Sequence, residues 1–122
     1  MPIPCLIIAG ADYARRERHI SEILQQQTSI QRAAILLEGI PSGQAELSTL
    51  SQVVHLQRLA SGCLCCAGKL VFQVSIQRSL KQHPDYLILA LAQTDHQREV
   101  LSLLSASSYA NWLQTPHIVL LD

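Results

Sequence analysis

The sequence predicts an α/β domain in three layers, with a mainly parallel sheet between helices. Short apolar runs alternate with stretches in which apolar residues recur at helical spacing. Most of the apolar runs carry no polar face, which is typical of strands covered by helices on both sides of a sheet. The chain has 122 residues, 48% hydrophobic and 15% charged, so one domain with one core is expected.

Five segments have the pattern of strands, and most of them are apolar throughout. The first ends at Gly10, and the third alternates apolar and polar residues from Val54 onward. We expect these strands over residues 3–10, 33–39, 53–59, 84–92 and 117–122.

Three segments between the strands have helical spacing. Asp12 is a candidate N-cap for a helix over residues 13–27, whose apolar stripe contains Ile20 and Leu24. Further helices are expected over residues 69–82 and 95–107. Pro41 and Gly43 predict a loop, followed by a short helical turn.

Charge and composition exclude several kinds of partner. The formal net charge is zero, so no overall field attracts nucleic acid or an anionic membrane. Aromatic residues make up 4% of the chain, too few for a platform that stacks single-stranded nucleic acid. No apolar run approaches the roughly 20 residues of a membrane span, and the N-terminus lacks the pattern of a signal peptide. We therefore expect a cytoplasmic protein with neither a nucleic-acid nor a membrane partner.

The stretch "AGADYARRERHI" stands where an α/β domain binds phosphate, between the first strand and the first helix. A phosphate loop has the pattern G-x-x-x-x-G-K-[ST]. Here Gly10 takes the first glycine position, but Arg15, Arg16 and Glu17 replace the second glycine, the lysine and the hydroxyl residue. We expect a degenerate loop, no bound nucleotide, no catalytic residue, and a solvated, charged first helical turn.

The stretch "SGCLCCAG" holds Cys63, Cys65 and Cys66, between the third strand and the second helix. Clustered thiols in a reducing compartment are metal ligands or redox groups more often than disulfides. Thiolates suit zinc and similar transition metals, and three protein ligands leave a fourth position open. His19, His55 and Glu38 are candidates for that position. Packing of the thiols in the core is the alternative, and it is the interpretation we give to Cys5 inside the first strand.

The motif Gly62-Cys63-Leu64-Cys65-Cys66, placed between a strand and a helix, resembles the CobW-type family of P-loop GTPases, which are relatives of nickel chaperones. The resemblance extends along most of the chain. "CLIIAG" stands at the family's first strand, and "AAILLEG" resembles its strand ending in Asn-Glu, with Glu38 matching the glutamate and Leu37 replacing the asparagine. "PDYLILALAQ" and "HIVLLD" resemble two later strands.

The resemblance implies a P-loop NTPase-like, or Rossmann-like, fold that handles zinc or cobalt. The departures concern the nucleotide: the phosphate loop is altered, Ala90 to Gln93 replace a Glu-x-x-Gly motif, and no Asn-Lys-x-Asp motif is present. We expect a single degenerate domain over residues 1–122, truncated at its C-terminus. We expect it to bind a zinc-like ion through Cys63, Cys65 and Cys66 in metal homeostasis or delivery, without GTP hydrolysis.

Two other functions stay open at this stage. One is a GTPase with an aberrant loop, in which Arg16 contacts phosphate. The other is a protein-interaction module without metal. Beyond the metal ion, the candidate partners are a metal-receiving protein and a second copy of the chain.

Overall fold

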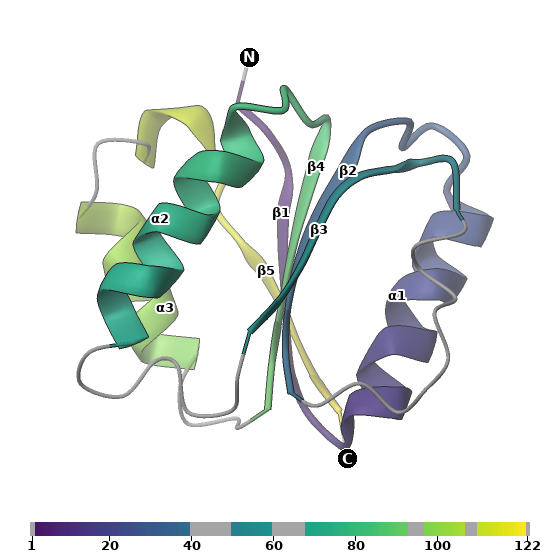
Figure 1. The fold of residues 1–122 in the computed structure, drawn as a ribbon, viewed down its shortest axis with the longest axis horizontal. Coiled ribbons are helices and arrows are strands. Elements are labelled where there is room, and N and C mark those ends of the chain that lie inside the picture. The colour runs from purple at the N-terminus through teal and green to yellow at the C-terminus, as the bar shows by residue number, and fades with distance from the viewer. Residues whose placement is uncertain (1, 40–49, 60–67, 93–96, 107–109, 122) are drawn as a thin grey trace.

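The fold is a five-stranded sheet with helices on both faces, as Figure 1 shows. This computed structural model describes residues 2–39, 50–59, 68–92, 97–106 and 110–121. The strand order is β3-β2-β4-β1-β5, and every neighbouring pair is parallel. The predicted three-layer α/β architecture is therefore confirmed.

The elements lie close to the predicted ranges. In chain order they are β1 (Cys5–Gly10), α1 (Tyr13–Gln26), β2 (Ala33–Glu38), β3 (Val53–Leu59), α2 (Gly68–Leu80), β4 (Tyr86–Leu91), α3 (Gln97–Ala106), η3 (Ala110–Trp112) and β5 (His117–Leu121). The short 3-10 turn η3 was not predicted. The helical turn expected after Gly43 falls outside the described residues.

The helices cover the two faces of the sheet unequally. Of the described α-helices, α1 lies on one face, and α2 and α3 lie together on the other (Figure 1). Because successive strand residues point to opposite faces, each central strand contributes to both cores. On the α1 side the core includes Ile8, Ile35, Ile88, Ile20 and Leu24. On the other side it includes Ile7, Leu36, Leu89, Phe72, Ile76 and Val100.

Cys5 shows how completely the central strands are covered. Every residue of β1 is buried, because β1 lies between β4 and β5 and is covered by helices on both sides. The Cys5 side chain is 4% exposed, and this burial raises the pKa of its thiol to about 12. The interpretation of Cys5 as a packing residue is confirmed.

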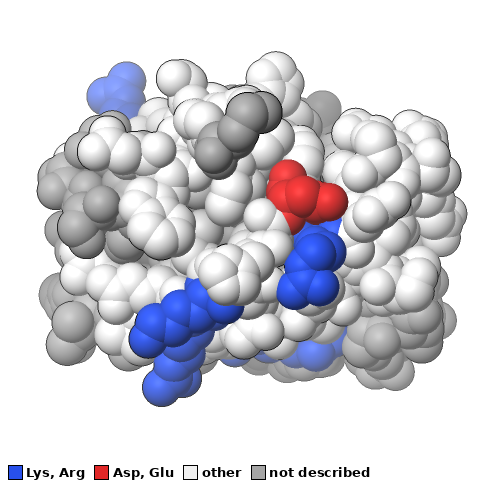
Figure 2. Space-filling view, turned by 90° about the horizontal axis from the view of Figure 1, so that it is seen from above, with Lys and Arg blue, Asp and Glu red and all other residues white. Residues whose placement is uncertain are grey.

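The amino-terminal edge of the sheet is held by polar side chains that bind backbone groups of neighbouring turns. The two carboxylate oxygens of Asp85 accept hydrogen bonds from the backbone N–H groups of Gln31 and Arg32, at 2.9 and 3.0 Å. The side chain of Arg32 donates in turn to the carbonyls of His83 and Gln82. Figure 2 views the molecule from this end, where basic atoms lie beside an acidic group. The contact ties the α1–β2 turn to the α2–β4 turn.

Among the described residues, no helix has both the length and the apolar character needed to cross a membrane.

Candidate functional site

The carboxyl-terminal edge of the sheet contains a topological switch point. Strands β1 and β4 are neighbours, but α1 follows β1 on one face and α3 follows β4 on the other (Figure 1). Open α/β sheets bind their ligands at such a point, outside the carboxyl ends of the strands.

Arg16 is buried at this edge, so the expected solvated first turn of α1 is wrong. The side chains of Arg16 and Glu17 are each 3% exposed, whereas Arg15 is exposed. The reason is helical spacing: Arg16 lies four residues before Ile20, and Glu17 lies three before it, so both share the buried face of α1.

The guanidinium of Arg16 binds backbone carbonyls from two strand ends. Nη1 donates to the carbonyl of Gly10 at 3.2 Å and to that of Ala11, and Nη2 donates to the carbonyl of Glu38 at 2.7 Å. Desolvation lowers the pKa of Arg16, while the charges of Glu38 and Asp12 oppose that shift. Arg16 thus joins the ends of β1 and β2.

The turn that receives Arg16 is short and tightly constrained. Residues 11 and 12 alone separate β1 from α1. Gly10 and Ala11 both have positive φ angles, 99° and 60°. Asp12 caps α1, and its carboxylate accepts a hydrogen bond from the backbone N–H of Arg15 at 2.8 Å, which confirms the predicted cap.

Glu38 lies at the end of β2 and is only 2% exposed. Its Oε1 atom accepts a hydrogen bond from the backbone N–H of Ala92 at 2.8 Å, just beyond the end of β4. Glu38 is therefore a buried acceptor and not a solvated carboxylate. This hydrogen bond connects the end of β2 to the residue that follows β4.

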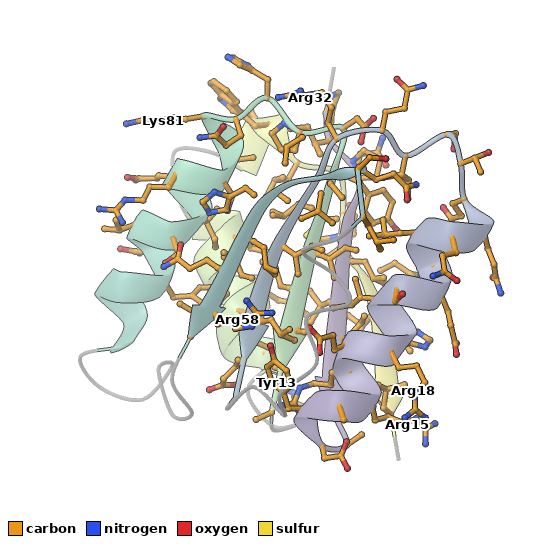
Figure 3. The ribbon with its side chains drawn as sticks, turned by 45° about the vertical axis from the view of Figure 1, so that its right-hand side comes forward. Tyr13, Arg15, Arg18, Arg32, Arg58 and Lys81 are labelled. Carbon is orange, nitrogen blue, oxygen red and sulfur yellow. The ribbon has the colours of Figure 1, made fainter. Side chains whose placement is uncertain are left out.

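A second polar group connects α1 with the edge strand β3. Arg58 donates from Nε to the hydroxyl of Tyr13 at 2.7 Å and forms a 3.5 Å ion pair with Oε1 of Glu17. Figure 3 shows Tyr13 and Arg58 pointing toward one another between the helix and the strand, with Arg15 and Arg18 on the outer side of α1. Burial raises the pKa of Tyr13.

Sequence reasoning missed Tyr13 and Arg58, although signals for both exist. Alternation along β3 places Arg58 on the same face as Leu56, which packs on the α1 side. An arginine that points from a strand toward the covering helix needs a hydrogen-bond partner on that helix. Tyr13, the first residue of α1, lies one turn before Glu17 and provides that partner.

The three cysteines of the predicted metal site, Cys63, Cys65 and Cys66, lie outside the described residues. Their flanks can be placed. β3 ends at Leu59, whose carbonyl accepts a hydrogen bond from the backbone N–H of Gly39 at 2.8 Å, and α2 begins at Gly68. Because every strand of the sheet runs the same way, β3 ends at the carboxyl-terminal edge, where Arg16 and Glu38 lie.

The candidate histidine ligands do not come together. His55 pairs with Ala34 and shares its face of the sheet, on the side of α2, whereas His19 lies on α1 over the opposite face. Of the other histidines, His117 is exposed at the start of β5, and His96 is outside the described residues. Within the described part of the chain, no three His, Cys, Asp or Glu residues group in a way that could hold a metal ion.

The fold and this edge together define an α/β domain of the Rossmann or P-loop-like class. A stretch of 59 residues is 34% identical to the zinc chaperone YeiR of Escherichia coli (strain K12). The stretch makes up 48% of this chain and 18% of that protein, so this chain matches about a fifth of its relative's length. The similarity supports a resemblance to CobW-type proteins over that stretch. No family model matches the chain, and no solved structure matches it.

Proposed function

We propose that this domain binds a zinc-like ion through the thiolates of Cys63, Cys65 and Cys66 and serves in metal homeostasis or delivery. The observation that carries the proposal is the complete Gly-Cys-x-Cys-Cys motif, residues 62–66, between β3 and α2. The similarity to a zinc chaperone supports the metal-related part of the proposal.

The placement of the flanking elements supports metal chemistry at this position. The motif follows the carboxyl end of β3 and precedes the first residue of α2. The partial positive charge of a helix N-terminus stabilises nearby thiolates and lowers their pKa. Thiolate is the form that binds zinc, so binding releases protons and affinity falls as the pH is lowered.

The fourth coordination position is proposed to be open to water or to a ligand of the receiving protein. Three protein ligands with one open position suit exchange of the ion, whereas structural zinc sites normally have four protein ligands. One carboxylate oxygen of Glu38 is engaged by the backbone of Ala92, and His19 and His55 lie on opposite faces. These contacts argue against recruiting any of the three as a permanent fourth ligand.

GTP hydrolysis is not part of the proposed function. The rival interpretation needs the Arg16 side chain to contact phosphate, but its guanidinium is buried and donates to the carbonyls of Gly10, Ala11 and Glu38. We expect GTP turnover with magnesium to equal the background rate, because the lysine and hydroxyl positions of a phosphate loop hold Arg16 and Glu17. Turnover that disappears in Arg16→Ala would favour the GTPase.

The proposal is tested by titrating the reduced protein with Co²⁺ and recording thiolate-to-metal charge-transfer absorption. We expect one equivalent to bind in the parent. Cys65→Ser should weaken binding at least about 10-fold, because it removes one of the three thiolate ligands and the negative charge that this ligand places beside the cation. Cys5→Ser is the matched control, because Cys5 is buried in β1, and its metal affinity should equal that of the parent. Equal affinity in all three proteins would refute the proposed site.

A further inference from the structure

The turn between β1 and α1 presents carbonyl oxygens to its interior. The carbonyls of Gly10, Ala11 and Glu38 all accept hydrogen bonds from the one guanidinium of Arg16. A phosphate-binding turn has the opposite polarity, because backbone N–H groups converge on the anion.

Two N–H groups at the start of α1, those of Arg15 and Arg16, have internal acceptors. The N–H of Arg15 donates to the Asp12 carboxylate at 2.8 Å, and the N–H of Arg16 donates to the Asp12 carbonyl at 3.1 Å. The Asp12 carboxylate also places negative charge at the end of the helix that would otherwise attract an anion. An incoming phosphate would therefore meet a carboxylate and a set of carbonyl oxygens.

The space inside the turn is filled. Arg16 is 3% exposed, and a β-carbon added at Gly39 would lie 2.7 Å from its Nη2 atom and 2.8 Å from Cδ2 of Tyr13. Gly39 has a φ of +133°, which side-chain-bearing residues rarely adopt. The backbone at Gly39, directly after the end of β2, therefore lies in close contact with the guanidinium of Arg16.

We propose that the β1–α1 turn is a cradle for a guanidinium cation, with its polarity inverted relative to a phosphate loop. The turn binds the side chain of Arg16 permanently and does not bind the phosphates of a nucleotide. The cradle is built by the carbonyls of Gly10, Ala11 and Glu38, and it is independent of the proposed metal site.

Chemical rescue tests the cradle. In Arg16→Ala the carbonyls lose their donor, and methylguanidinium offers the same planar fork as a free ligand. We expect methylguanidinium chloride, at about ten times its dissociation constant, to raise the melting temperature of Arg16→Ala by about 5 °C. The rise should saturate as the concentration increases. The parent and Arg18→Ala, an exposed arginine of the same helix, should show no such rise at equal ionic strength.

The anion arm uses sodium phosphate and Mg²⁺–GTP against sodium chloride of equal ionic strength. Neither should raise the melting temperature of the parent or of Arg16→Ala saturably, whereas the general stabilisation by excluded phosphate grows linearly with its concentration. Saturable stabilisation of either protein by phosphate or GTP would overturn the proposal, and so would a folded Arg16→Ala that methylguanidinium leaves unchanged.

Arg16→Lys keeps the test decisive if the alanine variant does not fold. This substitution restores the lysine of a phosphate loop at its motif position. An inverted cradle predicts that Arg16→Lys gains no stabilisation from GTP or phosphate, whereas GTP-dependent stabilisation would overturn it. Metal binding by the same proteins is measured separately, so failure of the cradle and failure of the zinc site can be distinguished.

Discussion

At the amino-terminal edge of the sheet, exposed side chains bind backbone groups: Asp85 and Arg32 both connect two turns in contact with solvent. At the carboxyl-terminal edge Arg16 and Glu38 also bind backbone groups, and Glu17 pairs with Arg58, but Arg16, Glu17 and Glu38 are each 2–3% exposed. The two edges of one sheet thus use similar bonds in very different surroundings.

The difference in exposure distinguishes the carboxyl-terminal edge as the one at which charged side chains are buried. Exposed contacts of the first kind contribute modestly, because water competes for the same donors and acceptors. Buried charges are costly to desolvate, and hydrogen bonds to both Nη atoms of Arg16 offset that cost although its buried Nε has no partner. Their concentration at the switch point indicates that this edge is constrained by more than packing, as expected for the edge where α/β domains bind ligands.

The largest effect should come from exchanging the two arginines for methionine, which keeps much of the side-chain length. Arg16→Met leaves three carbonyls without their buried donor and should lower the free energy of unfolding by about 4 kcal/mol. Arg32→Met removes exposed hydrogen bonds and should cost about 1 kcal/mol or less. Urea unfolding at neutral pH compares them, and equal losses would show that the two edges do not differ.

A second effect concerns Cys5, the cysteine at the start of β1. Its folded pKa of about 12 lies above the ordinary 9.0, so the neutral buried thiol contributes stability below pH 9 that is lost as the pH rises toward 12. The loss from this group should reach roughly 3 kcal/mol at pH 11.

The control is Cys5→Ala, measured by urea unfolding in a reducing buffer from pH 8 to pH 11. Its stability should fall less steeply over this range than that of the parent. Parallel curves would mean that the Cys5 thiol is not the titrating group.

Gly39→Ala should have a smaller effect, about 2 kcal/mol of destabilisation. The added β-carbon meets Arg16 and Tyr13 and is held at an unfavourable φ. In an Arg16→Ala background one of the two clashes is absent, so the same change should cost less than it does alone. Additive losses in the double variant would contradict the close approach of β2 to the guanidinium.

The smallest effect is expected from Asp85→Asn at the amino-terminal edge. The amide retains one oxygen that can accept from Gln31 or Arg32, and the site is solvated, so we expect a loss of about 1 kcal/mol. Thermal unfolding gives the value. A loss as large as that of Arg16→Met would reverse the ranking of the two edges.

The sequence was sufficient to predict the kind and approximate bounds of most elements. Uninterrupted apolar runs such as residues 33–39 have few alternatives to a covered strand, and Asp12 followed by a helical stripe fixes the start of α1. The strand order could not be predicted in this way, because it depends on which apolar strands pair over long separations in the chain. The contact between Glu38 and Ala92 is unpredictable for the same reason, since it requires that β4 lie beside β2.

The burial of Arg16 and Glu17 follows from their spacing to Ile20, which places both on the buried face of α1 in spite of their charge. The partners of Arg16 could not be predicted, because they are three backbone carbonyls, and backbone groups leave no signal in the sequence. For Cys63, Cys65 and Cys66 the sequence motif remains the basis of the site, and their coordination of one ion stays a prediction.

Metal analysis therefore tests the central claim most directly. The protein is purified without chelators and without a metal-binding tag, and its zinc content is measured beside that of a variant with Cys63, Cys65 and Cys66 all changed to serine. The account predicts about one zinc per chain in the parent and none in the variant. Equal metal content in the two proteins would contradict it.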